Sequence, residues 1–250
     1  MRHSRMNKRR IRWWIPASVL LLGALVAAGC LYLMPYKPDE RAIAALHSGG
    51  SLKTVEQPGW IGFIPERRTE PSVLFYPGGL VQAESYAPLA RALAWSGHAV
   101  YIIRMPLNLA VLGGDRALPV IDSEPDASFV IGGHSLGGVM ASRFAVSHPD
   151  RIKGVYFLGS YPDPKGALAD VDMPVLSVTG SLDGVLNRDK YEKARSLLPA
   201  SAQHVKIEGG NHSQFGSYGL QKGDQPASIT PDEQQQRIVQ ELEAWLQQIK

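Results

Sequence analysis

Short continuous runs of hydrophobic residues alternate along most of the chain with longer segments that have a helical pattern. The runs lie at residues 72–76, 99–103, 128–131, 155–158, 175–178 and 205–207, and their only polar positions are Ser72, Ser128, Ser177 and Lys206. Runs that are mainly apolar are typical of strands buried on both faces, as in a parallel sheet. The segments predicted to be helices are 40–46, 86–95, 136–147 and 189–198.

The last predicted helix has the clearest beginning. Residues 230–233, Thr-Pro-Asp-Glu, have the pattern of a capping box with proline at the first helical position. One face of the segment that follows is hydrophobic and consists of Ile238, Leu242, Trp245, Leu246 and Ile249. Strands that alternate with helices in this way predict an α/β fold whose mostly parallel sheet is flanked by helices.

The N-terminal part of the chain has a different pattern. Residues 15–34 form a stretch of twenty residues without a charge. A helix of this length spans about 30 Å, the thickness of a bilayer core. The stretch is flanked by aromatic residues, which favour both membrane interfaces: Trp13, Trp14, Tyr32 and Tyr36. We therefore expect a transmembrane signal-anchor at residues 13–36.

The charges before this stretch predict its orientation. Residues 1–12 contain six basic residues and no acidic one. The positive-inside rule keeps such a tail in the cytoplasm. The rest of the chain would then lie outside the cytoplasm, attached to the cell membrane by a single transmembrane helix.

Three alternatives remain for the N-terminal segment. A cleaved signal peptide has a similar layout, although its apolar region is usually shorter, about 7–15 residues. The residues Val-Ala-Ala-Gly before Cys30 resemble the processing site of a lipoprotein, although apolar residues continue beyond Cys30. The third alternative is a buried core helix, which the basic flank disfavours. Because Cys30 is the only cysteine, no intrachain disulfide is possible.

The net charge of +3 comes from the basic tail. Without the six basic residues of the tail, 20 basic residues face 23 acidic ones, so the remainder carries about −3. This balance gives no reason to expect a nucleic-acid partner. The length of 250 residues suits one globular domain, which we place at 55–250 after a linker at 37–54.

Ser135 lies between the strand predicted at 128–131 and the helix predicted at 136–147. It is the central residue of Gly-His-Ser-Leu-Gly at 133–137, the single match to Gly-x-Ser-x-Gly in the chain. A tight turn from strand to helix exposes a serine hydroxyl and needs small residues on both sides. The beginning of the helix offers free backbone N–H groups, so the Leu136 N–H is expected to stabilise an oxyanion.

A serine hydroxyl becomes a useful nucleophile when a base that is oriented by a carboxylate accepts its proton. Asp183 follows the strand predicted at 175–178, and His212 follows the strand predicted at 205–207. Functional residues of parallel sheets gather at the carboxyl ends of the strands. We therefore expect Ser135, Asp183 and His212 to form a catalytic triad.

Other residues fit these roles less well. Asp172 precedes its strand, and Asp189 is expected to begin a helix. The remaining histidines lie in the tail, in the early segment, at strand starts, beside a helix stop or in the tight turn: His3, His47, His98, His134, His148 and His204. The alternatives for the two chosen residues are a turn-capping role for Asp183 and a surface-loop position for His212.

A second oxyanion donor is expected from the loop that follows residues 72–76. This loop reads Pro-Gly-Gly-Leu at 77–80, and its small residues allow the backbone to approach a substrate carbonyl. Both Gly79 and Leu80 are candidates, and we prefer Leu80. The proposed chemistry requires neither a metal ion nor a cofactor.

Together these motifs resemble the α/β-hydrolase superfamily. The resemblance rests on Gly-His-Ser-Leu-Gly-Gly at 133–138, Gly-Ser-Leu-Asp at 180–183 and Gly-Gly-Asn-His at 209–212, and it covers residues 55–250. The Pro-Gly-Gly-Leu-Val stretch at 77–81 and the segment 86–97 are similar to the compact group allied to dienelactone hydrolases. The resemblance implies an α/β-hydrolase fold.

The chain departs from these relatives in ways that bear on the substrate. Dienelactone hydrolases use a cysteine nucleophile where this chain has Ser135, and many lipases have His-Gly where it has Pro77-Gly78. The segment between residues 158 and 175 is too short for an extensive lid. The lack of a lid favours small or externally presented substrates. We expect a membrane-anchored serine hydrolase that cleaves carboxylic esters or related acyl compounds. The alternatives are an acyltransferase with the same triad and a non-catalytic binding domain.

Overall fold

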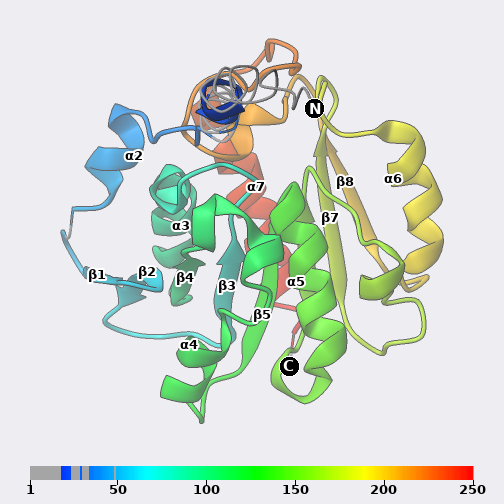
Figure 1. Cartoon of the computed structure of the whole chain (residues 1–250). Helices are drawn as coiled ribbons and strands as arrows, with labels where there is room; N and C mark the ends of the chain where they lie inside the picture. Colours follow the sequence, from blue (N-terminus) through cyan, green and yellow to red (C-terminus); the bar gives the residue numbers. More distant parts are fainter. Residues whose placement is uncertain (1–17, 24–28, 30–33, 48, 250) are drawn as a thin grey trace, which may run out of the picture. The chain divides into compact units, whose positions relative to one another are not determined.

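The computed structural model describes residues 18–23, 29, 34–47 and 49–249 (Figure 1). The chain divides into two units, residues 1–35 and 36–250, and each is considered by itself. In the first unit, residues 18–23 are helical. No helix within the described ranges is long and apolar enough to cross a membrane. Most of the anchor expected at 13–36, Cys30 included, lies outside the described residues.

The second unit is built on a sheet of eight strands in the order β1-β2-β4-β3-β5-β6-β7-β8. Strands β3 to β8 run parallel to one another, whereas β2 is antiparallel to both β1 and β4. The bounds are β1 Leu52–Gln57, β2 Trp60–Pro65, β3 Ser72–Tyr76, β4 Val100–Ile103, β5 Phe129–His134, β6 Val155–Leu158, β7 Val175–Gly180 and β8 Gln203–Ile207. The prediction of a mostly parallel sheet is confirmed.

Helices flank this sheet. The described α-helices of the second unit are α2 Glu40–Ala45, α3 Ala87–Ala94, α4 Leu118–Ser123, α5 Leu136–Ser147, α6 Arg188–Ala194 and α7 Pro231–Leu246. Single 3-10 turns are η1 Ala83–Tyr86, η2 Pro106–Asn108, η3 Ala110–Leu112, η4 Pro149–Arg151, η5 Pro164–Gly166, η6 Arg195–Leu197 and η7 Ser213–Phe215.

The sheet separates two hydrophobic cores, because successive side chains of a strand point to opposite faces. In β3, Val73 and Phe75 belong to one core, and Leu74 and Tyr76 belong to the other. The first core also contains residues of α3 and α7, and the second contains residues of α4 and α5. Figure 1 accordingly shows α4 and α5 in front of the sheet and α7 behind it.

Most predicted elements are present. The strands at 72–76 and 155–158 and the helix at 136–147 have the predicted bounds. The predicted capping box is formed at α7, where the Thr230 hydroxyl accepts the Glu233 N–H and the Glu233 carboxylate accepts the Thr230 N–H. The strand at 128–131 is longer than expected, because β5 continues through His134 to the serine.

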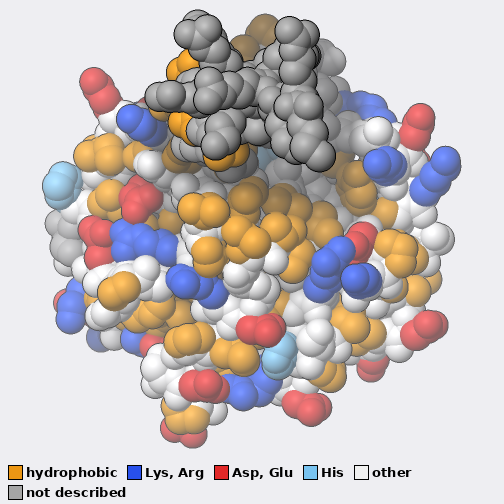
Figure 2. Space-filling view, viewed as in Figure 1, with side chains coloured by type: hydrophobic (Ala, Val, Ile, Leu, Met, Phe, Trp, Pro, Cys, Tyr) orange, Lys and Arg blue, Asp and Glu red, His pale blue; other side chains and the backbone are white. Residues whose placement is uncertain are grey.

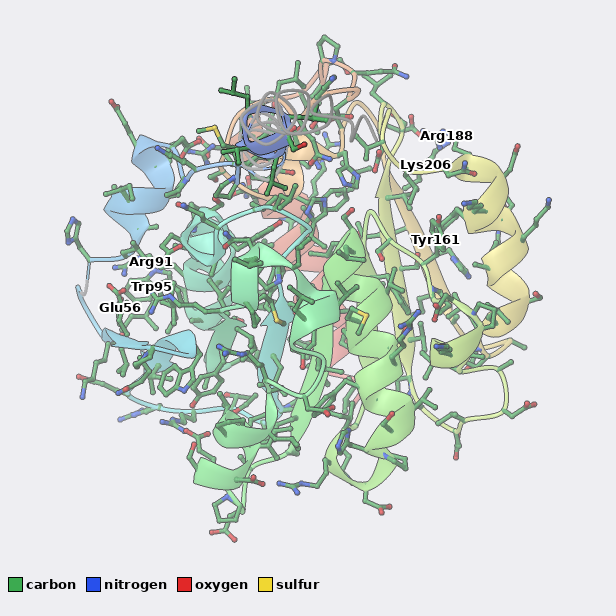
Figure 3. The ribbon with its side chains drawn as sticks, in the orientation of Figure 1. Glu56, Arg91, Trp95, Tyr161, Arg188 and Lys206 are labelled. Carbon is green, nitrogen blue, oxygen red and sulfur yellow. The ribbon has the colours of Figure 1, made fainter. Side chains whose placement is uncertain are left out.

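The segment 37–54, expected as a linker, contributes structure to the second unit. It contains α2, whose Ala42 is buried, and the first residues of β1. The Arg91 guanidinium of α3 donates to the His47 carbonyl oxygen at 2.6 Å, so the segment is held to α3. The same guanidinium lies 5.8 Å from the ring of Trp95 at the end of α3 (Figure 3). The segment therefore packs with the domain that follows it.

Candidate active site

Ser135 occupies a strained turn between β5 and α5. Its φ of 51° and ψ of −123° are rarely adopted by residues other than glycine, and such strain is common at functional sites. Its N–H donates to the Leu158 carbonyl oxygen of β6 at 3.0 Å, and the Ser160 hydroxyl donates to its carbonyl oxygen at 2.6 Å. The turn is therefore fixed on two sides by the neighbouring strand and its loop.

The glycines on either side of Ser135 are required by close packing. A Cβ atom on Gly137 would lie 2.5 Å from the Pro77 carbonyl oxygen and closer still to that of Tyr76. A Cβ atom on Gly133 would also overlap the Tyr76 carbonyl. The Gly-x-Ser-x-Gly pattern thus allows the nucleophile turn to pack directly on the end of β3.

Asp183 and His212 form a buried pair at the ends of β7 and β8. The Asp183 Oδ2 atom lies 2.8 Å from the His212 Nδ1 atom, and the two residues are 2% and 1% exposed. The Asp183 Oδ1 atom accepts the N–H groups of Val185 at 3.0 Å and Leu186 at 2.7 Å. These bonds hold the carboxylate so that it can orient the imidazole, as the acid of a triad does.

The second ring nitrogen of His212 is not used by the Asp183–His212 pair. The Nε2 atom is buried and has no hydrogen-bond partner among the described residues. His212 and Ser135 both line a cavity of about 270 Å³, together with Leu136, Gly159 and Tyr161. The structure therefore brings the expected nucleophile and the expected base to one cavity, with the expected acid behind the base.

Gly159 lies against the Asp183–His212 pair and was not singled out in the sequence. It follows β6 with a φ of 52°. A Cβ atom at this position would lie 3.1 Å from both the Asp183 Oδ2 atom and the His212 Nδ1 atom. A side chain here would disturb the pair, so glycine is needed for the geometry of the site.

Asp224 joins the two loops that carry the pair, and no sequence motif marked it. Its Oδ1 atom accepts the N–H groups of Gly184 at 3.0 Å and His212 at 3.3 Å. Its Oδ2 atom accepts the N–H and the hydroxyl of Ser213, at 2.8 and 2.6 Å. One carboxylate thus fixes the residue after Asp183 relative to His212.

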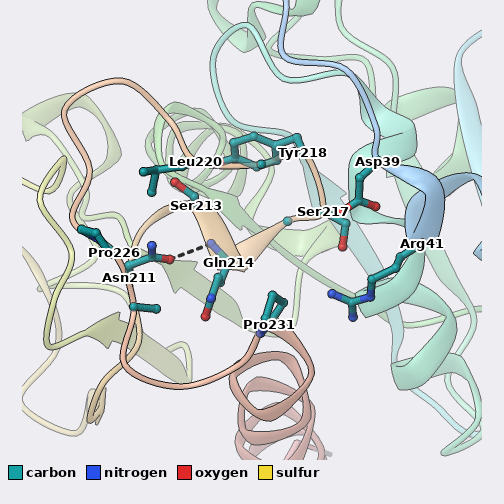
Figure 4. Close-up of a pocket in the computed structure, with 13 residues that line it drawn as sticks. Asp39, Arg41, Asn211, Ser213, Gln214, Ser217, Tyr218, Leu220, Pro226 and Pro231 are labelled. Atoms are coloured by element: carbon teal, nitrogen blue, oxygen red, sulfur yellow. Dashed lines mark hydrogen bonds between the residues drawn. The ribbon is translucent and has the colours of Figure 1, made fainter.

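The His212 loop is also held from its other side. The Asn211 Oδ1 atom accepts the Gln214 N–H at 3.0 Å, the bond drawn as a dashed line in Figure 4. The Asn211 N–H and carbonyl oxygen bond to the Gln234 amide of α7, at 2.9 and 2.8 Å. A separate cavity of about 310 Å³ lies behind the loop and is lined partly by Asp39 and Arg41 (Figure 4).

The two candidate oxyanion donors of the β3 loop differ in their hydrogen bonds. The Leu80 N–H donates to the Asn108 carbonyl oxygen at 2.7 Å, so it is already used. The Gly79 N–H has no partner within the described residues. A Cβ atom on Gly79 would lie 3.1 Å from the Leu136 side chain, so Gly79 is next to the other expected donor. This geometry favours Gly79 over Leu80, contrary to our preference from the sequence.

Tyr86 and His134 connect the loop after β3 to the turn that carries Ser135. The Tyr86 hydroxyl oxygen accepts the Gly78 N–H at 3.0 Å and lies 2.9 Å from the His134 Nδ1 atom. Both side chains are fully buried, and the His134 ring lies 4.3 Å from the His212 ring. Burial, and then the neighbouring His212, hold the pKa of His134 well below its usual range. His134 is therefore neutral, and the Tyr86 hydroxyl can donate to it.

Within the part of the chain that the structure describes, no group of three or more His, Cys, Asp or Glu side chains lies together in a way that could hold a metal ion.

Similarity to known proteins supports this assignment of the fold. A family model described as alpha/beta hydrolase family matches residues 72–236, more than half of the 250 residues. No curated protein is similar enough in sequence to count as a match.

Several solved structures are similar to the chain. A dienelactone hydrolase from Anabaena variabilis has 20% sequence identity and a TM-score of 0.60, over 79% of this chain and 100% of that one. An esterase from Mycobacterium tuberculosis has 16% identity and a TM-score of 0.54, over 82% and 95%. A membrane phospholipase A described as a bacterial virulence factor has 16% identity and a TM-score of 0.57, over 94% and 99%.

At these identities the solved structures establish the fold, whereas the family model also covers the nucleophile turn and both loops of the Asp183–His212 pair. The expected α/β-hydrolase architecture is confirmed, and family membership supports a hydrolase. The chain belongs to the alpha/beta hydrolase family.

Proposed function

We propose that the second unit is a serine hydrolase that cleaves carboxylic esters or related acyl compounds. The observation that carries the proposal is the buried Asp183–His212 pair. The Nε2 atom of His212 has no partner within the described residues, and His212 lines the same cavity as Ser135. Membership of the alpha/beta hydrolase family and the likeness to an esterase fold support it.

In the proposed reaction the Ser135 hydroxyl attacks the ester carbonyl while His212 Nε2 accepts its proton. The bond between the carbonyl carbon and the leaving oxygen then breaks, and His212 returns the proton to the departing alcohol. Water attacks the resulting acyl-enzyme with His212 again as the base, which releases the carboxylic acid and restores the serine hydroxyl. Asp183 orients the imidazole and stabilises its positive charge.

The N–H groups of Leu136 and Gly79 are the proposed oxyanion donors. Leu136 begins α5, so its N–H is not used in the helix. Two backbone donors at a fixed site stabilise the charge that develops on the carbonyl oxygen, and a single such donor is worth about 10²–10³ in kcat.

Hydrolysis of short-chain 4-nitrophenyl esters tests this function. We expect the wild-type chain to turn over 4-nitrophenyl acetate and Ser135→Ala or His212→Gln to lower kcat by about 10⁴-fold or more. Ser123→Ala is the matched control, because Ser123 lies at the end of α4 and its hydroxyl bonds only to the Val120 carbonyl oxygen. Unchanged turnover in Ser135→Ala would contradict the proposal. An acyltransferase would instead pass most of the acyl group to a dilute added alcohol although water is in large excess.

We also propose that residues 13–36 anchor the enzyme in the cell membrane with its catalytic unit outside the cytoplasm. The uncharged stretch at 15–34 and the basic residues before it support this proposal.

A further inference from the structure

A groove of about 480 Å³ lies next to the catalytic cavity. Val139 of α5 and Tyr161 line both spaces, so the groove begins where the catalytic cavity ends. Its other walls come from the loop after β6 and from α6 and η6. In Figure 3, Tyr161 lies beside α6. A substrate bound at Ser135 can therefore extend into this groove.

The wall of the groove is mainly hydrophobic. Besides Val139 and the ring of Tyr161, it includes Pro162, Pro164 and Leu197. Burial of an apolar chain against such a wall is favourable, because it removes apolar surface from water. The groove thus suits an aliphatic or aromatic segment of a substrate.

One edge of the groove is positively charged. Lys190 and Lys193 lie one turn apart on α6 and both line the groove. Neither lysine has an acidic partner at ion-pair distance within the described residues. Glu192, between them in the sequence, instead pairs with Arg195 at 3.3 Å. Figure 2 shows Lys and Arg side chains gathered over α6 on this face.

The one carboxylate in the groove wall does not neutralise these lysines. Asp163 forms an ion pair with Arg143, whose Nε atom lies 3.0 Å from the Asp163 Oδ1 atom. The hydrogen bond from Arg143 also holds the pKa of Asp163 below its usual range. Asp163 is therefore ionised and already paired, and the remaining charge of the groove is positive.

The groove is better placed for the acyl part of an ester than for the alcohol. The acyl group stays bonded to Ser135 during the reaction, whereas the alcohol must leave beside His212, which gives it a proton. The groove is walled by α5, the helix that follows Ser135, and includes none of the residues of the His212 loop. The acyl chain can thus remain in the groove while the alcohol departs.

We propose that the enzyme prefers esters whose acyl chain is apolar and ends in a carboxylate, that is, monoesters of dicarboxylic acids. The carbonyl carbon lies at Ser135, the apolar chain lies against Val139 and Leu197, and the terminal carboxylate pairs with Lys190 and Lys193. This inference rests on the proposed ester hydrolysis and adds a substrate class to it.

The test compares 4-nitrophenyl monoesters of dicarboxylic acids, from succinate to sebacate, with neutral partners. In each neutral partner the 4-nitrophenyl ester is kept and the free carboxylate is replaced by a methyl ester. For the wild-type chain at low ionic strength we expect kcat/KM for the acidic substrate of best length to exceed that of its neutral partner by about five- to tenfold, as two exposed ion pairs allow. The preference should shrink in 0.5 M salt, because salt screens exposed charges. Lys190→Gln/Lys193→Gln should abolish it, so that the acidic and the neutral ester are hydrolysed with similar kcat/KM.

Lys53→Gln/Lys153→Gln is the matched control. It removes the same charge from two exposed lysines on β1 and before β6, and it should keep the preference. Turnover of neutral esters with no preference for the acidic ones would overturn this inference and leave the ester-hydrolase proposal standing. A preference that survives in Lys190→Gln/Lys193→Gln would also overturn it. Failure to hydrolyse either kind of ester would refute both proposals.

Discussion

Within the described part of the chain, the Tyr86 hydroxyl is the one side-chain group that bonds both to the loop after β3 and to His134, the residue before Ser135. It accepts the Gly78 N–H, so it orients the peptide that precedes Gly79. Because Gly79 is the favoured oxyanion donor, a small displacement of this loop should weaken binding of the transition state more than binding of the substrate.

Tyr86→Phe is therefore expected to lower kcat by about tenfold with little change in KM. This fall in kcat is smaller than the loss of a whole oxyanion donor would cause. Tyr156→Phe is the control, because the fully buried Tyr156 hydroxyl also bonds to a backbone group, the Leu74 carbonyl oxygen at 3.0 Å, but this group belongs to β3 and not to the loop at 77–80. Both variants lose about 1 kcal/mol of stability. Equal kcat values for the two variants would show that Tyr86 has only a structural role.

His134 predicts a specific dependence of stability on pH. Its pKa is lower in the folded protein than in the unfolded chain, where it is about 6.5, so below that pH the unfolded chain binds a proton that the folded protein does not. The free energy of unfolding therefore falls as the pH falls from 7 to 5. His134→Gln removes this contribution. Between pH 7 and 5, the free energy of unfolding of the variant should therefore fall less steeply than that of the wild type, by up to about 1.4 kcal/mol per pH unit.

Urea unfolding at pH 7, 6 and 5 measures the two slopes. Glutamine can still accept a hydrogen bond from Tyr86, so the comparison isolates the titrating group. Parallel slopes for the wild type and His134→Gln would contradict the burial of a neutral histidine.

At the residue scale, the sequence predicted those groups whose chemistry and position relative to a strand are both distinctive. Ser135, Asp183 and His212 each follow an apolar run. The roles of Gly159 and Asp224 could not be predicted, because they arise from contacts with residues brought near only by folding. The choice between Gly79 and Leu80 likewise depended on the bond from Leu80 to Asn108, which no local pattern indicates.

At the scale of the elements, the contact between the nucleophile turn and β3 decides whether the site can form. Gly137 lies in the first turn of α5, where alanine would ordinarily favour the helix by up to about 1 kcal/mol. The Pro77 and Tyr76 carbonyl oxygens leave no space for a Cβ atom there. Helix propensity thus predicts that Gly137→Ala stabilises the protein, whereas close packing predicts that it destabilises the protein.

We expect Gly137→Ala to destabilise the protein by about 3 kcal/mol, the upper end of the usual range for overpacking. Gly59→Ala is the control, because a Cβ atom on Gly59 would meet nothing within 4 Å and its φ is not in the left-handed region. That change should stay within about 0.5 kcal/mol. Midpoints of urea unfolding measure both, and a Gly137→Ala variant as stable as the wild type would refute the packing argument.

Most of the predicted strands have a mainly apolar pattern, but the pattern did not decide every case: β2 is mainly apolar and was not predicted, whereas β8 was predicted although only Ile207 is buried. Strands β3 and β6 are buried at every position, so their runs are mainly apolar. Strand β1 was not predicted, because it lies at the edge of the sheet and only Leu52 of its six residues is buried. An edge strand with polar residues on both faces has no such run.

At the scale of the whole molecule, the two units predict two separable properties. If residues 13–36 anchor the chain, the full-length protein should remain in the membrane pellet after alkaline carbonate extraction, whereas a chain that begins at Tyr36 should be released. The shorter chain should keep its esterase activity, because the proposed catalytic residues lie within residues 36–250.

Cys30→Ser distinguishes the two kinds of anchor. A transmembrane helix tolerates this change, so the variant should stay in the membrane with an unchanged mass apart from the substitution. Loss of a lipid mass in the variant would identify a lipoprotein, and release of the full-length wild-type chain by carbonate would contradict anchoring by either route.

Labelling with a fluorophosphonate tests the central proposal most directly, because the reagent reacts covalently with activated serines. After proteolysis, mass spectrometry should find a single adduct on the peptide that contains Ser135. The adduct should disappear in Ser135→Ala and persist in Ser123→Ala. An adduct on another residue, or labelling that survives in Ser135→Ala, would contradict the assignment of Ser135 as the nucleophile.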